Sequence, residues 1–392
     1  MSVKSPIAIT ALASVSALGK NENEVWNRYT NDESYLKPHA IGNRQQYAGF
    51  LDREAQKEVE ALRLSDHKYK SLDKSVLFAM LASRKALLQT GWDKEAIFGI
   101  NIGSSRGATE LFEKYYKEFL DTDTSHTLTS PTTTLGNISS WVAHDLQCTG
   151  PEVSHSITCS TALHSLLNGI AWLRAGMCDK FLVGGSEAPL TDFTLAQMHA
   201  LKIYTQYTEN SPAEPWPNRA LELSKTRNTL VLGEGAAVCG LEIGEKENAL
   251  AYIEGIGYAT EILEHNISIS AEATCFQKSM KMALENTNIS EVDAIVMHAP
   301  GTKAGDLTEY KAIQKVFGAR LPMLTSNKWK IGHTFGASGL LSLELAVLML
   351  KNQQFIAVPF AEKQPERDSI RKVLVNAVGF GGNAVSILLT RA

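Results

Sequence analysis

The sequence predicts an α/β protein built from two similar halves. Short β-rich segments alternate with helix-like segments along the 392 residues, which is typical of α/β layers with largely parallel sheets. The order of these segments in the first half recurs in the second. Each half also holds one helix that is apolar nearly all round, at residues 161–175 and 336–350, and such a helix is buried on every side. Two matching βαβ units around a shared central layer account for this better than two ordinary core helices, and we expect them at residues 1–245 and 246–392.

In the first half, β-branched and apolar runs that stop at glycine or polar residues mark the strands, and apolar residues at helical spacing mark the helices. We expect strands at residues 6–15, 97–102, 153–158, 180–183 and 232–241. We expect helices at residues 21–29, 52–61, 72–89, 109–119, 136–146, 161–175 and 191–201. Residues 30–50 and 120–135 are expected to be irregular, and the proline-rich residues 205–230 to form a long surface excursion.

The second half repeats this order and ends in a hairpin around a glycine-rich turn. We expect strands at residues 251–258, 292–298, 321–326, 373–378 and 385–390, the last two as the hairpin. We expect helices at residues 270–285, 307–317 and 336–350.

The composition allows a large core and argues against several classes of protein. Apolar residues make up 44%, the formal net charge is -4, and no basic run alternates with aromatic residues, so nucleic-acid binding is not expected. The odd number of cysteines, without C-x-x-C or zinc-ligand spacing, argues against a disulfide frame or a metal site. The longest apolar run, residues 340–350, contains Glu344 and is too short to span a bilayer. We expect a cytoplasmic protein without membrane insertion.

Cys159 is the candidate nucleophile. It follows the β-rich run at 153–158 and precedes the apolar helix at 161–175, so its thiol is expected at a strand-to-helix turn. The partial positive charge at a helix start favours a thiolate over a thiol. The alternative is that Cys159 is a small buried side chain without a reactive role. Partners elsewhere in the chain have to decide between the two readings.

His298 and His333 stand in unusual settings in the second half. His298 ends an apolar strand and precedes an Ala-Pro-Gly turn, and the carboxyl end of a strand is where α/β proteins place their sites. His333 lies between a strand end and the start of the apolar helix at 336–350. Each histidine taken alone fits a structural role at least as well. The other eight histidines lack such a setting.

Several motifs together resemble the β-ketoacyl-acyl carrier protein synthases, and they occur in that family's order from the first strand to residue 390. No single motif is strong, but the set is highly specific. The motifs are Cys159-Ser-Thr-Ala-Leu-His164 with Leu182-Val-Gly-Gly185, Leu232-Gly-Glu-Gly-Ala236, His298-Ala-Pro-Gly-Thr-Lys-Ala-Gly-Asp306 with Glu309, Lys328 with Ile331-Gly-His-Thr334, and Gly379-Phe-Gly-Gly382.

The resemblance implies a thiolase-like fold of five αβαβα layers and a Cys-His-His site that needs no cofactor. Cys159 would receive an acyl chain from an acyl carrier protein, and a malonyl unit on the carrier would then lose carbon dioxide. N–H groups of His298 and His333 would stabilise the enolate charge, and the carbanion would attack the acyl-Cys159 carbonyl. Lys328, paired with Glu309, would support the histidine loops, with Asp306 as further structural support.

The resemblance also implies residues that contact the substrate. Phe380 resembles the family's gating phenylalanine, and the backbone N–H groups of Cys159 and Phe380 would hold the oxyanion. Thr302 and Gly381 are further substrate-binding candidates, because a hydroxyl can hold the phosphopantetheine arm and glycines let the backbone approach the substrate. The same family resemblance implies a homodimer, and it leaves open a heterodimer with a related chain.

The chain departs from the family's pattern at several places. Ala299-Pro300 replaces Gly-Thr in the first histidine motif, Trp329-Lys330 replaces a small or polar pair, and Val378 stands where an aromatic residue is frequent. The loop at 205–230 lacks the usual charge pattern. These changes leave the chemistry in place and put the acyl-chain preference in doubt, so a specialised polyene or polyketide pathway suits the chain as well as primary fatty acid synthesis.

Four competing interpretations were weighed against these residues. A thiolase needs a second cysteine near the glycine turn, where residues 379–383 have none. An initiating Cys-His-Asn synthase needs asparagine at the position of His333. A non-catalytic chain-length-factor-like partner subunit typically lacks the nucleophile, whereas Cys159 is present; it remains the alternative. A cysteine hydrolase leaves the two strand-end histidines and Lys328 without a role.

Docking of an acidic carrier protein requires a local basic patch, because the chain itself is slightly acidic. Lys68, Lys70 and Lys74 are the candidates, with Lys202 less certain. The alternative is that they are ordinary solvated charges.

Overall fold

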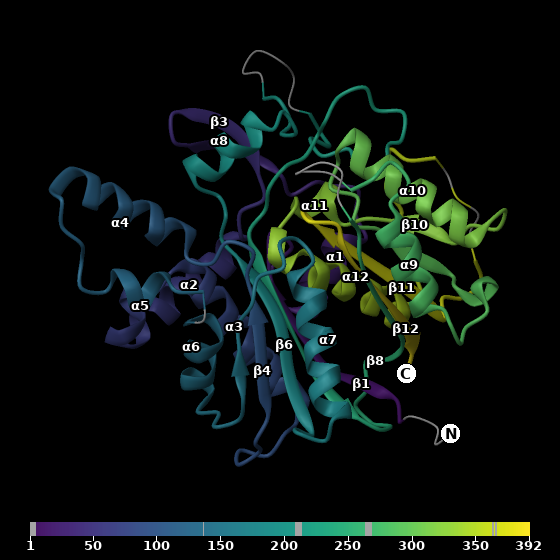
Figure 1. Ribbon diagram of the computed structural model, residues 1–392, viewed down its shortest axis with the longest axis horizontal. Helices are drawn as coiled ribbons and strands as arrows, with labels where there is room; N and C mark the ends of the chain where they lie inside the picture. The colour runs from purple at the N-terminus through teal and green to yellow at the C-terminus, as the bar shows by residue number, and fades with distance from the viewer. Residues whose placement is uncertain (1–4, 136, 208–213, 263–268, 363, 365–366) are drawn as a thin grey trace.

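The computed structural model describes residues 5–135, 137–207, 214–262, 269–362, 364 and 367–392. Ten strands form one sheet in the order β10-β9-β11-β12-β8-β1-β7-β6-β4-β5 (Figure 1). Their bounds are β1 Ile7–Val15, β4 Gly99–Gly103, β5 Glu152–Val153, β6 Lys180–Glu187, β7 Gly235–Ile243, β8 Ala251–Thr260, β9 Ala294–Val296, β10 Met323–Thr325, β11 Lys372–Gly379 and β12 Asn383–Arg391.

The two halves of this sheet have the same topology. In β5-β4-β6-β7-β1 and in β10-β9-β11-β12-β8, the first three strands are parallel and the next two pairings are antiparallel. The halves join where β1 pairs with β8 over Ile7, Ala8 and Ile9. The repeat expected from the sequence is therefore confirmed. The expectation of largely parallel sheets is wrong, because two of the four pairings within each half are antiparallel.

Helices cover both faces of each half-sheet and complete five layers. The central helices α7 Thr161–Arg174 and α12 Ser338–Asn352 contact each other and both half-sheets. Helices α3 Lys74–Thr90 and α6 Asn137–Leu146 cover the outer face of the first half. Helices α9 Thr274–Ala283 and α10 Lys303–Phe317 cover that of the second. The expected αβαβα layering is confirmed (Figure 1).

Only one of the two central helices is enclosed on every side. Every residue of α12 from Ser338 to Leu350 is buried, whereas α7 exposes Ala171 and Arg174. The region Phe335–Asn352 is long and apolar enough to cross a membrane, but 89% of it is buried inside the protein, as in a core helix.

The remaining helices lie around the layers. They are α1 Glu22–Tyr29, α2 Arg53–Ser65, α4 Thr109–Thr122, α5 Thr129–Thr133, α8 Asp192–Ala200 and α11 Lys328–Ile331, with 3-10 turns at His67–Ser71, Ile289–Glu291 and Phe335–Ala337. In Figure 1, α4 projects from the body of the molecule.

Two segments expected to be irregular contain regular structure. Residues 30–50 include the hairpin of β2 Lys37–Ile41 and β3 Arg44–Ala48, which turns at Gly42 with φ +59°. This hairpin was missed because its strands hold few β-branched or aromatic residues. Residues 120–135 include the short helix α5. The described part of the 205–230 loop is only partly at the surface, since Leu223, Ser224, Thr226 and Arg227 are exposed whereas Asn218, Ala220 and Thr229 are buried.

Candidate active site

Cys159 lies at the start of α7, at the end of an irregular segment. The strand expected at 153–158 is wrong beyond Val153, because β5 ends there and Thr158 has a φ of +46°. Thr161 stabilises this turn, since its hydroxyl accepts from the Ile157 N–H (2.9 Å) and donates to the Thr158 carbonyl (2.6 Å). The expected position of Cys159 before the buried helix is confirmed, and its exposed fraction is 6%.

Burial works against ionisation of the Cys159 thiol. Burial raises the pKa of Cys159 to about 12, and the Glu187 carboxylate adds to the shift, while Arg106 and Lys328 oppose it. The expected effect of the helix start on the thiolate stays a prediction, and removal of the thiol from water acts against it. The thiol needs a nearby base to lose its proton when it reacts.

His298 follows β9 and is held through its backbone. The N–H groups of His298 and Ala299 donate to the two carboxylate oxygens of Glu309, at 3.0 and 2.9 Å. Burial raises the pKa of Glu309 to about 7, and these two N–H groups lower it. Glu309 lies on α10, so this helix sets the position of the His298 backbone.

His333 faces His298 across the same space. The backbone N–H of His333 donates to the Val231 carbonyl at 2.7 Å, and the preceding residue, Gly332, has a φ of +75°. The two imidazole rings have centroids 5.1 Å apart and an interplanar angle of 88°. Burial lowers the pKa of His298 to about 3 and that of His333 well below its usual value, with help from the Lys328 charge. Both rings are therefore neutral, and each carries one N–H and one basic nitrogen.

Lys328 is fully buried, but it does not pair with Glu309 as expected. Its ammonium donates to Asn327 Oδ1 at 2.8 Å and to Ser342 Oγ at 3.1 Å, and no ion pair joins it to Glu309, although both residues are described. Burial lowers the pKa of Lys328 to about 8, while the nearby carboxylates of Glu309 and Asp306 raise it. The two carboxylate oxygens of Glu309 already accept backbone N–H groups. Lys328 therefore acts on His298 and His333 through the electrostatic effect of its charge.

The glycine turn, residues 379–382, is hydrogen-bonded to the segment that carries Cys159. Thr158 Oγ1 donates to the Phe380 carbonyl at 3.2 Å, and Ser160 Oγ donates to Asn383 Oδ1 at 2.5 Å. A Cβ added to Gly379 would lie 1.8 Å from Thr158 Oγ1, so this approach requires glycine. The Phe380 side chain is 44% exposed, which suits a side chain that moves.

One cavity of about 290 Å³ brings the main candidates together. It is lined by Cys159, His298, His333, Thr302 and Phe380. Most further lining residues are apolar, among them Met198, Leu201, Ile203, Leu230, Ile269, Phe276, Phe335 and Val378, while Asn228, Thr308 and Glu309 add polar groups. A small cavity with an apolar wall, one thiol and two neutral imidazoles can hold an acyl chain and carry out acyl transfer.

Other candidates lie beside the cavity or away from it. Thr302 caps α10 by accepting from the Gly305 N–H at 3.2 Å, and Gly381 has a φ of +100° and is not among the lining residues. Lys68, Lys70 and Lys74 do not line the cavity either. Lys74 forms an ion pair with Glu110 at 2.8 Å.

Glu187 is a site residue that the sequence reasoning missed. It ends β6, is fully buried, and accepts from Ser104 Oγ, from Ser105 N and Oγ, from Arg106 N and from Gly336 N at 2.7–3.1 Å. These contacts tie the segment after β4 to the start of α12 beside Cys159. An acidic residue at the end of the apolar run Lys180–Glu187 was the available signal.

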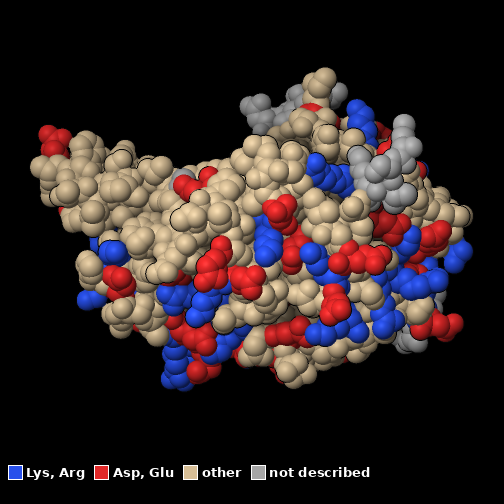
Figure 2. Space-filling model, turned by 90° about the horizontal axis from the view of Figure 1, so that it is seen from below, with Lys and Arg blue, Asp and Glu red and all other residues tan. Residues whose placement is uncertain are grey.

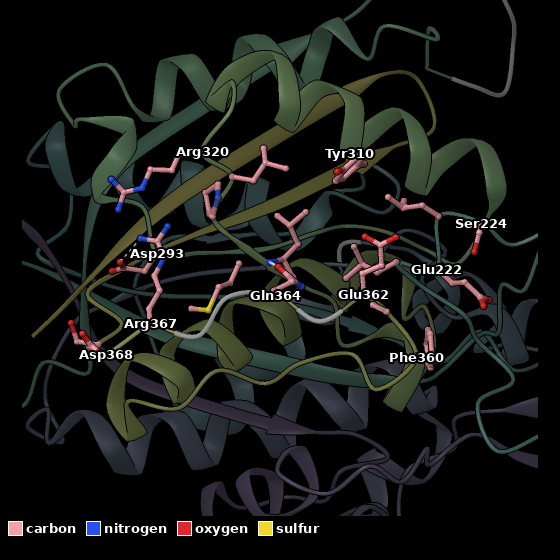
Figure 3. A pocket seen from close by; sticks show the side chains of 18 of the residues that line it. Glu222, Ser224, Asp293, Tyr310, Arg320, Phe360, Glu362, Gln364, Arg367 and Asp368 are labelled. Carbon is pink, nitrogen blue, oxygen red and sulfur yellow. Dashed lines mark hydrogen bonds and ion pairs between the residues drawn. The ribbon is translucent and has the colours of Figure 1, made fainter.

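A larger cavity of about 720 Å³ lies elsewhere and contains none of these residues. Figure 3 shows its mixed lining of Glu222, Asp293, Tyr310, Arg320 and Asp368. It lies beside β10 and is lined by four carboxylates and three arginines. The nucleophile and the histidines make the smaller cavity the candidate active site.

Comparisons with known proteins agree with this geometry. The model of the β-ketoacyl synthase N-terminal domain matches residues 4–247, and that of the C-terminal domain matches residues 250–359. The chain is 28% identical over 416 residues to 3-oxoacyl-[acyl-carrier-protein] synthase 2 of Coxiella burnetii, covering 99% of each. It is 26% identical over 407 residues to nodulation protein E of Rhizobium sp., covering 97% of this chain and 98% of that protein.

Solved structures show the same fold. The ishigamide ketosynthase/chain length factor superposes with a TM-score of 0.87 at 20% identity, covering 100% of both chains. A β-ketoacyl synthase from Burkholderia phymatum gives 0.84 at 21% identity, covering 99% of this chain and 100% of that one. The ketosynthase ApeO, solved in complex with its chain length factor ApeC from Xenorhabdus doucetiae, gives 0.80 at 20% identity, covering 99% and 98%.

Proposed function

The chain belongs to the β-ketoacyl synthase family of condensing acyltransferases, and we propose that it joins an acyl chain on Cys159 to a malonyl unit on an acyl carrier protein, releasing carbon dioxide and a 3-oxoacyl product. The observation that carries the proposal is the cavity shared by Cys159, His298 and His333. The carrier is proposed because relatives such as the Coxiella protein are named for it.

The first step loads the acyl chain. A neutral imidazole accepts the thiol proton of Cys159, and the sulfur attacks the acyl thioester carbonyl. The carrier's sulfur leaves as the thiol after it takes up a proton. The backbone N–H groups of Cys159 and Phe380 stabilise the oxyanion of this step. The neutral state of both histidines supports this role, because an imidazolium has no free nitrogen to accept the proton.

The second step forms the carbon nucleophile and the new bond. The malonyl carboxylate leaves as carbon dioxide, and its bonding electrons form an enolate whose oxygen accepts the N–H groups of His298 and His333. The enolate carbon then attacks the acyl-Cys159 carbonyl. Collapse of the tetrahedral adduct expels the Cys159 sulfur, which regains a proton. The experiment is to offer malonyl-carrier protein with a panel of acyl-carrier proteins and to read product masses.

The proposal also includes a dimer, as a homodimer or as a heterodimer with a related chain. Supporting this, the projecting helix α4 exposes an apolar stripe at i, i+4, i+7 and i+8, formed by Phe112 (61%), Tyr116 (56%), Phe119 (43%) and Leu120 (65%). Figure 2 shows this arm as mostly uncharged. An exposed stripe of this kind marks an interaction surface. A related subunit is considered because ApeO was solved with a chain length factor.

The alternative function, a non-catalytic chain-length partner, is disfavoured by the complete Cys-His-His set in one cavity. A cytoplasmic location is supported by the five free cysteines.

A further inference from the structure

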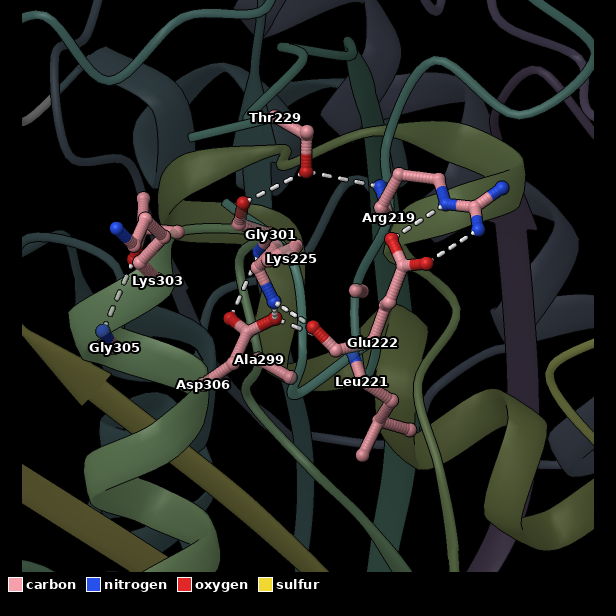
Figure 4. A network of polar contacts seen from close by, with 12 residues as sticks. Arg219, Leu221, Glu222, Lys225, Thr229, Ala299, Gly301, Lys303, Gly305 and Asp306 are labelled. Atoms are coloured by element: carbon pink, nitrogen blue, oxygen red, sulfur yellow. Dashed lines mark hydrogen bonds and ion pairs between the residues drawn. The ribbon is translucent and has the colours of Figure 1, made fainter. Parts of the chain in front are cut away.

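The loop between α8 and β7 contacts the turn that carries His298. Figure 4 shows the part of this loop from Arg219 to Thr229 beside Ala299, Gly301 and Asp306. Within the loop, Asn218 is 0% exposed, Thr229 is 2% exposed and Lys225 is 9% exposed. This loop is therefore part of the wall behind the catalytic histidine.

The loop holds the backbone that follows His298. Asn218 Nδ2 donates to the Pro300 carbonyl at 3.0 Å. The N–H and the hydroxyl of Thr229 both donate to the Gly301 carbonyl, at 2.9 and 2.8 Å. The Gly301 N–H donates to Asp306 Oδ1 at 3.0 Å. Three backbone groups of this turn are thus fixed by partners outside it.

The turn needs such partners, because its backbone is strained. Ala299 has a φ of +22°, in a region that residues with a Cβ rarely adopt, and Gly301 has a φ of +94°. A Cβ on Gly301 would lie 2.8 Å from Asn218 Oδ1, so loop and turn are in direct contact. The turn keeps this shape only while the surrounding contacts enforce it.

A buried ion pair ties the loop to the turn. Lys225 Nζ lies 2.6 Å from Asp306 Oδ2, and the two side chains are 3% and 0% exposed. Asp306 also accepts from the Leu221 N–H at 3.1 Å, and Lys225 also donates to the Glu222 carbonyl at 2.9 Å. A buried carboxylate without a partner takes up a proton or is displaced. The ammonium of Lys225 therefore opposes the effect of burial on the pKa of Asp306 and holds this carboxylate in place under Gly301.

Resting on the proposed function, we propose that Lys225 is a positioning residue for decarboxylation, because its ion pair with Asp306 holds the 299–302 turn and thereby aims His298 at the malonyl thioester oxygen. The loop contacts named above reach the turn after His298. The Cys159 segment is fastened separately, by Thr161 and by the glycine turn. Substitution of Lys225 is therefore expected to slow one half-reaction, the decarboxylation of malonyl-carrier protein, and to leave the other, the acylation of Cys159, unchanged.

The test compares Lys225→Met with Glu222→Gln as a matched control. Glu222 lies on the same loop, and its side chain pairs with Arg219 at 2.6 Å and contacts neither the turn nor Asp306. Malonyl-carrier decarboxylation and acylation of Cys159 are measured separately. Lys225→Met is expected to lower kcat for decarboxylation by about 100-fold, the effect of a displacement near 1 Å, with the acylation rate unchanged. Lys225→Arg, which keeps the charge, is expected to recover part of the decarboxylation rate.

Equal losses in both half-reactions, or a Lys225→Met variant that behaves like Glu222→Gln, would overturn the inference. If Lys225→Met does not fold, Asp306→Asn is measured in the same assays, with the same selective loss expected and the same outcomes against it. A wild-type protein without condensing activity would contradict the proposed function instead. An active wild type with an indifferent Lys225→Met variant would contradict only the role of Lys225.

Discussion

The imidazoles of His298 and His333 stand almost perpendicular, with ring centroids 5.1 Å apart, and both line the cavity of Cys159. They reach this cavity from two different elements, the end of β9 and the turn after α11. Because burial keeps both rings neutral, two N–H groups can converge on one developing oxyanion without the repulsion that two cations would cause.

The first prediction concerns the role of His298 in decarboxylation. His298→Ala removes one donor to the enolate oxygen, and loss of such a donor costs about 3 kcal/mol, or about 100-fold in kcat. Acylation of Cys159 should persist, since His333 retains a basic nitrogen. Release of carbon dioxide from malonyl-carrier protein is measured beside acyl-enzyme formation by mass. An unchanged decarboxylation rate would remove His298 from this role.

The second prediction concerns the reactivity of the Cys159 thiol. With the pKa of Cys159 at about 12, the thiolate fraction should rise about tenfold per pH unit between about pH 6 and 9. The rate of alkylation by iodoacetamide should follow it without a plateau, after subtraction of a Cys159→Ala background that contains the partly exposed Cys148 and Cys178. A plateau near neutral pH would mean that the helix start does stabilise a thiolate.

The third prediction concerns the stability of the fold in acid. The folded pKa of His298 is about 3, whereas an unfolded histidine titrates at about 6.5. Between these values the unfolded chain binds one more proton, so this histidine lowers the free energy of unfolding as the pH falls. The slope is about 1.4 kcal/mol per pH unit well inside the window.

His298→Asn removes this contribution. The free energy of unfolding of the wild type minus that of the variant should fall by about 1.4 kcal/mol from about pH 5.5 to 4.5. Buried carboxyls with raised pKa values, such as Glu344, act in the opposite direction but are present in both proteins, so the difference isolates the histidine. Urea titrations at both pH values provide the measurement. A difference independent of pH would show that His298 is protonated in the folded protein.

The fourth prediction concerns the carrier-docking lysines, which stay a hypothesis. Reversal of Lys68, Lys70 and Lys74 to glutamate should raise KM for carrier-bound substrate and abolish its salt dependence, because an acidic carrier is attracted by exposed charge. Lys74 should contribute least, since it already pairs with Glu110. Reversal of the exposed Lys278 and Lys281 on α9 is the control. Equal effects of the two sets on KM would show that net charge alone matters.

Much of the fold was predictable, because periodicity and glycine stops mark most elements. Helix α3 ends before Gly91, whose φ is +67°, as the sequence indicated. The repeat indicated two matching halves around a central layer, and the αβαβα layering followed from the family resemblance. The strand expected up to Thr158 failed, because the Thr161 hydroxyl competes for the backbone of this segment. The β2–β3 hairpin was missed, because its strands hold few β-branched or aromatic residues.

Long-range polar contacts limited the prediction of the site. The motifs indicated Cys159, His298 and His333, and one cavity brings them together. They did not reveal that Glu309 binds backbone N–H groups instead of Lys328, or that Lys225 meets Asp306 across 81 positions. Such pairs depend on which loop crosses which turn, and no local pattern encodes that.

The most direct test of the central claim is the mass of the intact protein after incubation with acyl-carrier protein, followed by malonyl-carrier protein. The wild type is expected to gain the mass of one acyl group. Digestion should locate this group on a single peptide that contains Cys159. Addition of malonyl-carrier protein should remove the group from the enzyme and yield a 3-oxoacyl product. Cys159→Ala is expected to show neither the mass gain nor the product. Full turnover by Cys159→Ala would contradict the account.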